Sequence, residues 1–269
     1  MRREERQGVA VYRFETLPAG VDALVSTRLG GVSPPPYDSL NIGPRVGDDP
    51  ANVLANRERL LAAFGSELGR SVWCRQVHGD RVAVVAEADA GRGAREEETV
   101  VAEADAMVTA TPGLALCVKV ADCVPVLLFD PERGVLGLAH AGWGGTVARI
   151  CSRTVATMSE RFGSDPAAVR AAIGPSIGPA GYEVGAEVIA RAEAAYGERA
   201  GDLLTPAAEG KALLDLWSAN RIDLEQAGVP AARIETAAIA SDQRLEEFFS
   251  HRREGAATGR FAAIARLVA

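Results

Sequence analysis

The sequence predicts an α/β protein of the α+β type, built as one domain over residues 1–269 on mixed β-sheets. Three observations support this prediction. Short apolar runs of strand length recur along the chain. Several of these runs follow one another directly, so the strict strand–helix alternation of a parallel α/β fold is missing. The chain also contains no internal repeat, Pro/Ser-rich linker or break in composition, and 48 % hydrophobic residues suit a packed core.

The expected strands are apolar runs bounded by turn residues. They cover residues 9–14, 23–27, 71–77, 81–85, 106–109, 114–120, 124–129, 135–139, 169–173, 234–239 and 261–268. The expected helices cover residues 49–64, 146–162, 183–196 and 214–227. The first helix has a capping residue in Asp49, followed by Pro50 in its first turn.

Two long segments do not fit a regular element. Residues 27–50 are dense in Gly, Pro, Ser and Asn, and long irregular segments inside a compact domain are often functional. Residues 87–103 carry the charged run GRGAREEE and are expected to form a solvated surface loop.

Charge and cysteine usage exclude several classes of protein. The formal net charge of −7 argues against a general nucleic-acid binder, which needs clustered positive charge. The sequence contains no run of 18 uninterrupted apolar residues, so it predicts no membrane span. The charged N-terminus lacks the apolar region of a signal peptide. The four cysteines show no CxxC pair. We therefore expect a cytoplasmic protein that is a monomer or a small homo-oligomer.

The scarce histidines are the first indication of chemistry. His78, His140 and His251, together with Cys123, all stand at the ends of apolar runs, where α/β proteins place their sites. Two imidazoles and one thiolate would make an open, catalytic type of zinc site. Spacing alone leaves two alternatives: unrelated polar positions, or a cysteine hydrolase with Cys123 as nucleophile and His140 as base.

Three blocks give the sequence a family resemblance: QVHG at residues 76–79, ADCVPVLL at 121–128 and HAGW at 140–143. They resemble blocks of the YfiH-like family, also called laccase-domain proteins, polyphenol oxidases or peptidoglycan editing factors, and further blocks match in order over nearly the whole chain. The resemblance implies a four-layer helix–sheet–sheet–helix sandwich. It also implies one metal ion per chain, generally zinc, on His78, Cys123 and His140.

The resemblance further implies a purine nucleoside enzyme. Members are reported to phosphorolyse adenosine, inosine and methylthioadenosine and to deaminate adenosine, so purine nucleosides and phosphate are the expected partners. The alternatives are a Cys/His amide hydrolase and a peptidoglycan-editing factor, including a non-enzymatic one. Copper-dependent phenol oxidation ranks lower, because three histidines cannot build a multicopper centre, although Cu²⁺ can compete for such a site in vitro.

Several residues near the motifs are candidates for substrate chemistry. Asp122 is a candidate acid/base, or a residue that only orients a metal ligand. Arg57 is a candidate phosphate clamp, with a surface helix arginine as the alternative. Asn41 and Gln76 are amides that could read a purine edge or a ribose hydroxyl. The remaining candidates are Lys119 facing the pocket, Trp143 and Tyr182 stacking on a purine, and His251, Arg252 and Arg253 in the site wall. For each of them the alternative is an ordinary core or surface residue without a role in the site.

The chain departs from the family pattern at a few positions. Gly144 stands where the family usually has Arg in HAGWRG, and Ala180 and Gly181 stand where it often has Cys. None of these positions is an expected metal ligand. They leave open which substrate and which of the reported activities this chain keeps.

Overall fold

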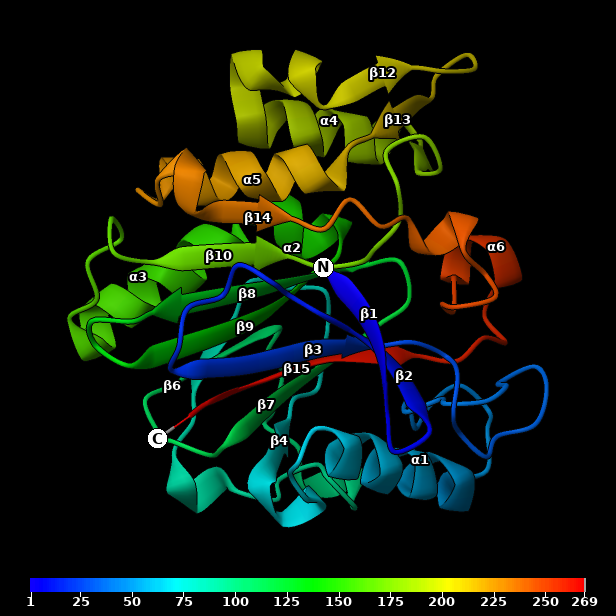
Figure 1. Cartoon of the computed structure of the whole chain (residues 1–269). Coiled ribbons are helices and arrows are strands. Elements are labelled where there is room, and N and C mark those ends of the chain that lie inside the picture. The colour runs from blue at the N-terminus through cyan, green and yellow to red at the C-terminus, as the bar shows by residue number, and fades with distance from the viewer. Residues whose placement is uncertain (269) are drawn as a thin grey trace.

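The computed structural model describes residues 1–268. Its first sheet has six strands in the order β1-β2-β3-β15-β7-β4. These are β1 (Arg2–Arg6), β2 (Val9–Arg13), β3 (Val21–Ser26), β15 (Phe261–Leu267), β7 (Ala115–Val120) and β4 (Ser71–Trp73). The C-terminal strand β15 pairs antiparallel with both β3 and β7. The end of the chain therefore forms the middle of this sheet (Figure 1).

The second sheet also has six strands, in the order β14-β10-β8-β9-β6-β5. They are β14 (Ile234–Thr236), β10 (Arg170–Ile173), β8 (Val124–Asp130), β9 (Val135–Ala141), β6 (Ala106–Thr109) and β5 (Val82–Val84). Both sheets mix parallel and antiparallel pairs, because β4 runs parallel to β7 and β5 runs parallel to β6. A small third sheet joins β11 (Glu183–Val184), β13 (Ala212–Leu214) and β12 (Leu204–Pro206).

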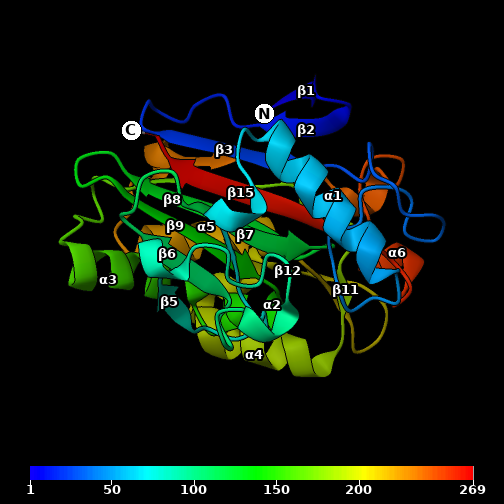
Figure 2. The same ribbon diagram turned by 90° about the horizontal axis from the view of Figure 1, so that it is seen from below.

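Helices cover the outer faces of the two stacked sheets (Figures 1 and 2). Helix α1 (Pro50–Ala63) packs on the first sheet through Leu60 and Leu61. The second sheet is covered by α2 (Trp143–Val147), α3 (Ile150–Phe162), α4 (Ala186–Tyr196) and α5 (Leu216–Gln226). A separate apolar cluster, which includes Val72, Leu116 and Leu127, fills the space between the sheets. The expected mixed α/β architecture with helix–sheet–sheet–helix layering is therefore confirmed.

The remaining short elements lie in the connections. Helix α6 (His251–Glu254) precedes the last strand. Turns of 3₁₀ helix cover Leu68–Arg70, Glu87–Asp89, Glu97–Thr99, Gly197–Asp202, Ala231–Arg233 and Ser241–Gln243.

The helix expected over residues 146–162 is two helices, α2 and α3, with a break at Arg149. Arg149 adopts a left-handed backbone conformation with φ of 67°. Asp223 of α5 explains the break, because its buried carboxylate accepts hydrogen bonds from the backbone N–H groups of Cys151 and Ser152, both at 3.1 Å. A side chain from a distant helix thus caps α3, which local periodicity does not reveal.

Other boundaries also differ from the expectations. The strands expected at 71–77 and 81–85 are short, because the segment between β4 and β5 is a loop. The helices expected at 183–196 and 214–227 begin later, since β11 and β13 occupy their first residues. Strand β1 was not expected from the apolar pattern, because its sequence, RREER, has no apolar residue. The loop at 87–103 is only partly solvated, because Ala94, Val100 and Val101 are buried.

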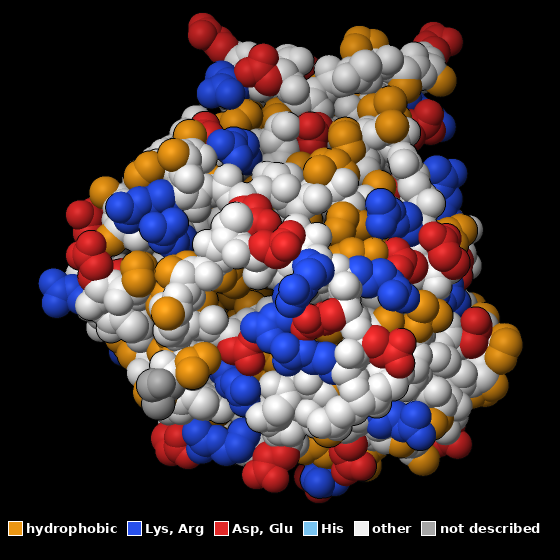
Figure 3. All heavy atoms as spheres, in the orientation of Figure 1, with side chains coloured by type: hydrophobic (Ala, Val, Ile, Leu, Met, Phe, Trp, Pro, Cys, Tyr) orange, Lys and Arg blue, Asp and Glu red, His pale blue; other side chains and the backbone are white. Residues whose placement is uncertain are grey.

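The face that carries β1 and β2 mixes basic and acidic side chains (Figure 3). Ion pairs join Arg3 to Glu247 at 2.6 Å and Arg6 to Glu4 at 2.7 Å. Such charged pairs suit an exposed edge strand, because they oppose pairing with another chain. Among residues 1–268, no helix combines the length and apolar character needed to cross a membrane.

Candidate metal centre and its two cavities

Three candidate ligands meet, two from connections between strands and one from a strand. His78 lies in the loop after β4, Cys123 lies between β7 and β8, and His140 lies near the end of β9. One potential ligand atom from each residue lies within 4.8 Å of the other two. The ligands come from both sheets, since β4 and β7 belong to the first sheet and β8 and β9 to the second. The grouping expected from the sequence is therefore present in the structure.

The backbone around the ligands is specialised. His78 and Asp122 are two of the non-glycine residues with positive φ, at 60° and 81°. Such conformations are unfavourable for most side chains and often accompany functional sites. The backbone of Gly142 also borders the ligands closely. A Cβ atom on Gly142 would lie 2.7 Å from Cδ2 of His78 and 3.1 Å from Sγ of Cys123, so only glycine fits here without movement.

Asp105, the residue immediately before β6, holds two of the candidate ligands in place. Its fully buried carboxylate lies 2.8 Å from Nδ1 of His140. It also accepts hydrogen bonds from the backbone N–H groups of Val77, His78 and Gly79 at 3.1, 3.0 and 2.8 Å. Since a carboxylate only accepts, Nδ1 of His140 carries the proton and Nε2 is the ring atom left for a metal ion.

The charges of this cluster favour the metal-binding form of the thiol. Burial alone would raise the pKa of Cys123, but the His140 and His78 imidazoles outweigh burial and lower this pKa to about 6. Burial likewise opposes the charged form of His140, whose pKa is nevertheless raised to about 9 by the Cys123 thiolate and the Asp105 carboxylate. Two imidazoles and a readily formed thiolate are a chemically suitable donor set for a metal ion with an open coordination position.

Asp122, expected as an acid/base, has its carboxylate turned to the C-terminal segment. Its oxygens accept hydrogen bonds from the Ser241 and Ser250 hydroxyls at 2.8 and 3.0 Å and from the Arg252 backbone N–H at 2.6 Å. Burial raises the pKa of this carboxyl despite these bonds. The contacts suit a residue that fixes the loop carrying Cys123; an acid/base role remains a prediction.

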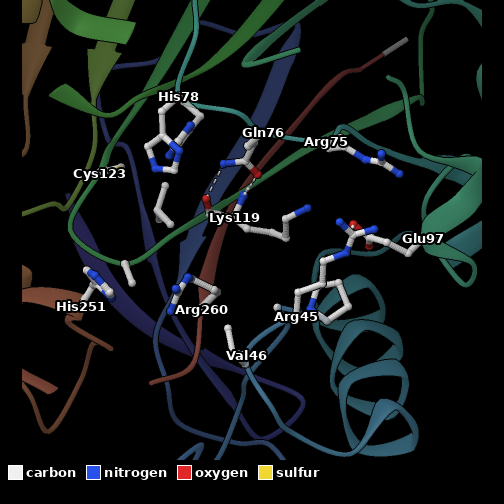
Figure 4. A pocket seen from close by; sticks show the side chains of 15 residues that line it. Arg45, Val46, Arg75, Gln76, His78, Glu97, Lys119, Cys123, His251 and Arg260 are labelled. Carbon is white, nitrogen blue, oxygen red and sulfur yellow. Dashed lines mark hydrogen bonds and ion pairs between the residues drawn. The ribbon is translucent and has the colours of Figure 1, made fainter. Parts of the chain in front are cut away.

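The candidate metal centre lies where two cavities adjoin. The larger has a volume of about 360 Å³ and contains four Lys or Arg side chains in its lining but one acidic side chain (Figure 4): Arg45, Arg75, Lys119, Arg260 and Glu97. The smaller, of about 270 Å³, is lined by Trp143, Ile177, Tyr182 and Leu216, among others. His78, Cys123 and His251 line both cavities. A ligand can therefore meet several cations on one side of the candidate centre and, on the other, a wall with two aromatic rings in which Arg252 lies over Tyr182.

The structure separates the amides and cations that the sequence singled out. Gln76 lines the larger cavity, and its side-chain amide pairs with the backbone of Lys119 through bonds of 2.7 and 2.9 Å. Asn41 is fully buried, and its Oδ1 accepts from the backbone N–H groups of Gly43 and Arg260. Both Lys119 and Gln76 therefore border the cavity, whereas Asn41 supports its wall from behind.

Arg57 also lies away from the cavity surface. Its side chain is 3 % exposed and donates hydrogen bonds to the backbone carbonyls of Ile42, Gly93 and Ala94. The structure therefore brings neither Arg57 nor Asn41 together with the metal ligands, and a substrate contact by either residue would require a rearrangement.

Sequence reasoning missed several residues that shape the site. Arg45, Arg75 and Arg260 line the larger cavity, but an arginine-rich chain gives no signal that selects these three. Asp105 carried a usable signal, because an acidic residue between two alanines at the start of an apolar strand needs a buried partner. Gly144, one of the departures noted above, has a structural role: a Cβ there would lie 2.7 Å from the His78 carbonyl oxygen.

With the geometry established, comparison with known proteins places the chain in a family. A family model described as multi-copper polyphenol oxidoreductase laccase matches residues 22–268. The chain belongs to this laccase family. The resemblance seen in the three motif blocks is thereby confirmed, and its match extends over almost the entire chain.

Several relatives carry the names of nucleoside enzymes. The chain is 38 % identical over 245 residues to "Purine nucleoside phosphorylase YlmD" of Geobacillus stearothermophilus, covering 91 % of this chain and 89 % of the relative. It is 44 % identical over 244 residues to "Purine nucleoside phosphorylase" of Deinococcus radiodurans, covering 89 % and 86 %. "Adenosine deaminase RL5", from an unknown prokaryotic organism, is 39 % identical over 241 residues, covering 90 % and 92 %.

The fold of the laccase-family chain also matches a solved relative closely. The crystal structure of YlmD from Geobacillus stearothermophilus superposes with a TM-score of 0.94 at 36 % identity, covering 99 % of this chain and 98 % of that one. The family description mentions several coppers, whereas the described residues 1–268 contain one group of three potential ligands, with two histidines.

Proposed function

We propose that the protein is a zinc-dependent purine nucleoside phosphorylase with adenosine deaminase activity. The observation that carries the proposal is the His78–Cys123–His140 cluster at the junction of a basic and an aromatic cavity. The relatives named as purine nucleoside phosphorylases and as an adenosine deaminase support it. A single zinc ion suits a donor set of two imidazoles and one thiolate. A multicopper centre needs more histidines than the three in the chain.

The two cavities suit the two halves of the reaction. A purine would stack in the smaller cavity, beside Tyr182 and Trp143, with its ribose reaching toward the metal ligands. Inorganic phosphate would bind in the larger cavity near Arg260, whose pKa is lowered by burial and raised in part by the nearby Cys123 and Asp122 charges. An arginine fork matches the geometry of phosphate oxygens, so Arg260 replaces Arg57 as the proposed clamp.

The protein residues divide the remaining tasks. A zinc ion on the three ligands would supply a Lewis acid that polarises water or a substrate oxygen. Asp105 fixes the tautomer of His140 and the position of the His78 loop. His251 borders both cavities and is exposed, so its imidazole is suitably located to exchange a proton between substrate and solvent. Asp122 fixes the loop that carries Cys123.

The test combines elemental analysis with adenosine turnover. Purified protein is expected to contain about one zinc per chain, the capacity of a single such site. Adenine formed only with phosphate identifies phosphorolysis, and inosine formed without phosphate identifies deamination. Cys123→Ser should lose both the metal and both activities. A variant that keeps full metal content and full turnover would rule out the proposed ligand set.

A second candidate is a metal-free cysteine hydrolase, because the same cluster lowers the pKa of Cys123 and places it beside His140. Such an enzyme would cleave an amide, be insensitive to chelators and be inactivated by alkylation of its thiol. Either enzyme would suit the reducing cytoplasm, since all four cysteines among the described residues are free thiols.

A further inference from the structure

One end of the larger cavity carries an excess of positive charge that the proposed reaction does not use. In Figure 4, Arg45, Arg75 and Glu97 lie across the cavity from His78 and Cys123, with Lys119 between the two groups. We call Arg45, Arg75 and Lys119 the distal cations. Arg260, the proposed partner of the attacking phosphate, is not one of them.

Within the described part of the chain, the three distal cations share one acidic side chain of the cavity lining, Glu97, whose Oε2 is itself buried without a hydrogen-bond partner. Nζ of Lys119 donates to the Cys74 carbonyl at 3.2 Å and lies 6.0 Å from the centre of the Trp73 ring, and burial lowers its pKa. Nε of Arg75 is buried without a hydrogen-bond partner. Arg45 lies 3.7 Å from Glu97, the single acidic residue in the cavity lining.

The second layer of the wall adds to this excess. The buried Arg57 guanidinium does not line the cavity; its Cζ atom lies 4.4 Å from the centre of the buried Trp73 ring, the ring that Lys119 also approaches. Its Nη2 atom has no hydrogen-bond partner among residues 1–268. Buried cationic nitrogens without a hydrogen-bond partner are unfavourable, and three cations outnumber one carboxylate here, so this end of the cavity is suited to a ligand that brings negative charge and several acceptor oxygens.

We propose that the distal cations form a phosphoryl-binding subsite, separate from the metal centre, and that its ligand is the 5′-phosphate of a purine nucleotide. A phosphate ester offers two charges and three acceptor oxygens to guanidinium and ammonium donors. The assignment rests on the proposed function, because a purine in the aromatic cavity and a ribose at the metal centre direct the 5′-carbon into the larger cavity.

The subsite changes the substrate class and leaves the reaction unchanged. An oxygen of inorganic phosphate forms a bond to C1′ while the C1′–N9 bond breaks, and the purine leaves with the electron pair and takes up a proton. The 5′-phosphate stays attached throughout. With AMP the products are adenine and ribose 1,5-bisphosphate. An uncharged methylthio group at the 5′ position would gain nothing from the distal cations.

The experiment compares AMP, adenosine and 5′-methylthioadenosine by kcat/KM on the zinc-loaded protein at saturating phosphate, and by calorimetric binding to the zinc-free protein, which the proposed function expects to be inactive. We expect kcat/KM and the association constant to be at least about tenfold higher for AMP than for adenosine, the effect of one charge-assisted contact. Arg45→Gln and Arg75→Gln should each reduce the AMP-to-adenosine ratio about tenfold. Arg133→Gln, an exposed arginine in the β8–β9 turn, is the matched control and should keep the wild-type ratio.

The outcomes separate this inference from the proposed function. Equal use of AMP and adenosine, with a ratio unmoved by either variant, overturns the subsite while adenosine phosphorolysis stands. A higher KM for inorganic phosphate in Arg45→Gln, with an unchanged ratio, also overturns it in favour of a co-substrate site. If no nucleoside is converted, the proposed function fails and the binding comparison alone decides. Arg45 is 61 % exposed, so its variant is informative even if Arg75→Gln does not fold.

Discussion

Asp105 and His140 are joined by a 2.8 Å contact between a carboxylate oxygen and Nδ1, both inside the protein. The same carboxylate holds the backbone of the loop that carries His78. The Asp105 side chain, immediately before β6, thus positions two of the three candidate metal ligands. It does so without contacting Nε2 of His140, the ring atom left for a metal ion.

Asp105→Asn tests this control. The variant replaces a charged acceptor by an amide, which weakens the contact to His140 and the hold on the His78 loop. We expect the affinity for zinc to fall about 10- to 100-fold, as for other residues that orient metal ligands. The measurement is a competition titration with a chelating dye. Asp130→Asn, at a buried aspartate that ends β8, is the control and should bind zinc normally.

Gly142→Ala tests how closely the backbone borders the ligands. The new Cβ would meet Cδ2 of His78 at 2.7 Å, so the ring must move and the three donor atoms can no longer converge as they do. We expect a loss of zinc content by elemental analysis, with the fold retained by circular dichroism. Gly201→Ala has open space around its Cβ and should bind a full complement of zinc. Full zinc content in Gly142→Ala would contradict the close approach of the Gly142 backbone to the ligands.

Metal removal should lower the stability of the chain. Free zinc at about 1,000 times its dissociation constant stabilises a single-site protein by about 4 kcal/mol. For a chain of this size, that corresponds to a rise in Tm of roughly 8–16 °C over the chelated form. Differential scanning calorimetry with and without a chelator measures the shift. Cys123→Ser should melt at one temperature in both conditions, and a zinc-dependent shift in that variant would disprove the role of the thiolate.

Asp223→Ala tests the cap that breaks the expected long helix. The substitution leaves the backbone N–H groups of Cys151 and Ser152 without their acceptor and removes the partner of Arg149, which lies 3.2 Å away. We expect a loss of about 3 kcal/mol or more in the free energy of unfolding, measured by urea titration. Asp202→Ala, from an exposed ion pair with Arg199, should cost less than about 1 kcal/mol.

The sequence was most informative where the core is most apolar. Strands β7, β8 and β9 lie within about two residues of their expected bounds, because fully buried strands carry continuous apolar runs. Strand β12 gave no such signal, since two of its three residues are exposed. The break between α2 and α3 depends on Asp223, more than 60 residues away along the chain.

In the candidate site, too, some residues could be predicted from the sequence and others could not. The motif residues His78, Cys123 and His140 were identified from the sequence, and the structure brings them together. Asn41 and Arg57 have polar side chains in a promising segment, but the fold uses both to satisfy buried backbone groups. Their type and spacing cannot distinguish a side chain that binds substrate from one that supports a loop, because burial is decided by tertiary packing.

The position of β15 has a consequence for synthesis. Without this last strand the first sheet divides into β1-β2-β3 on one side and β7-β4 on the other. His78 follows β4 and Cys123 follows β7, so the sheet that carries them becomes continuous only after β15, which is made later than both strands. A chain shortened before β15 should therefore be unable to acquire the metal, so metal uptake would report that the first sheet is continuous.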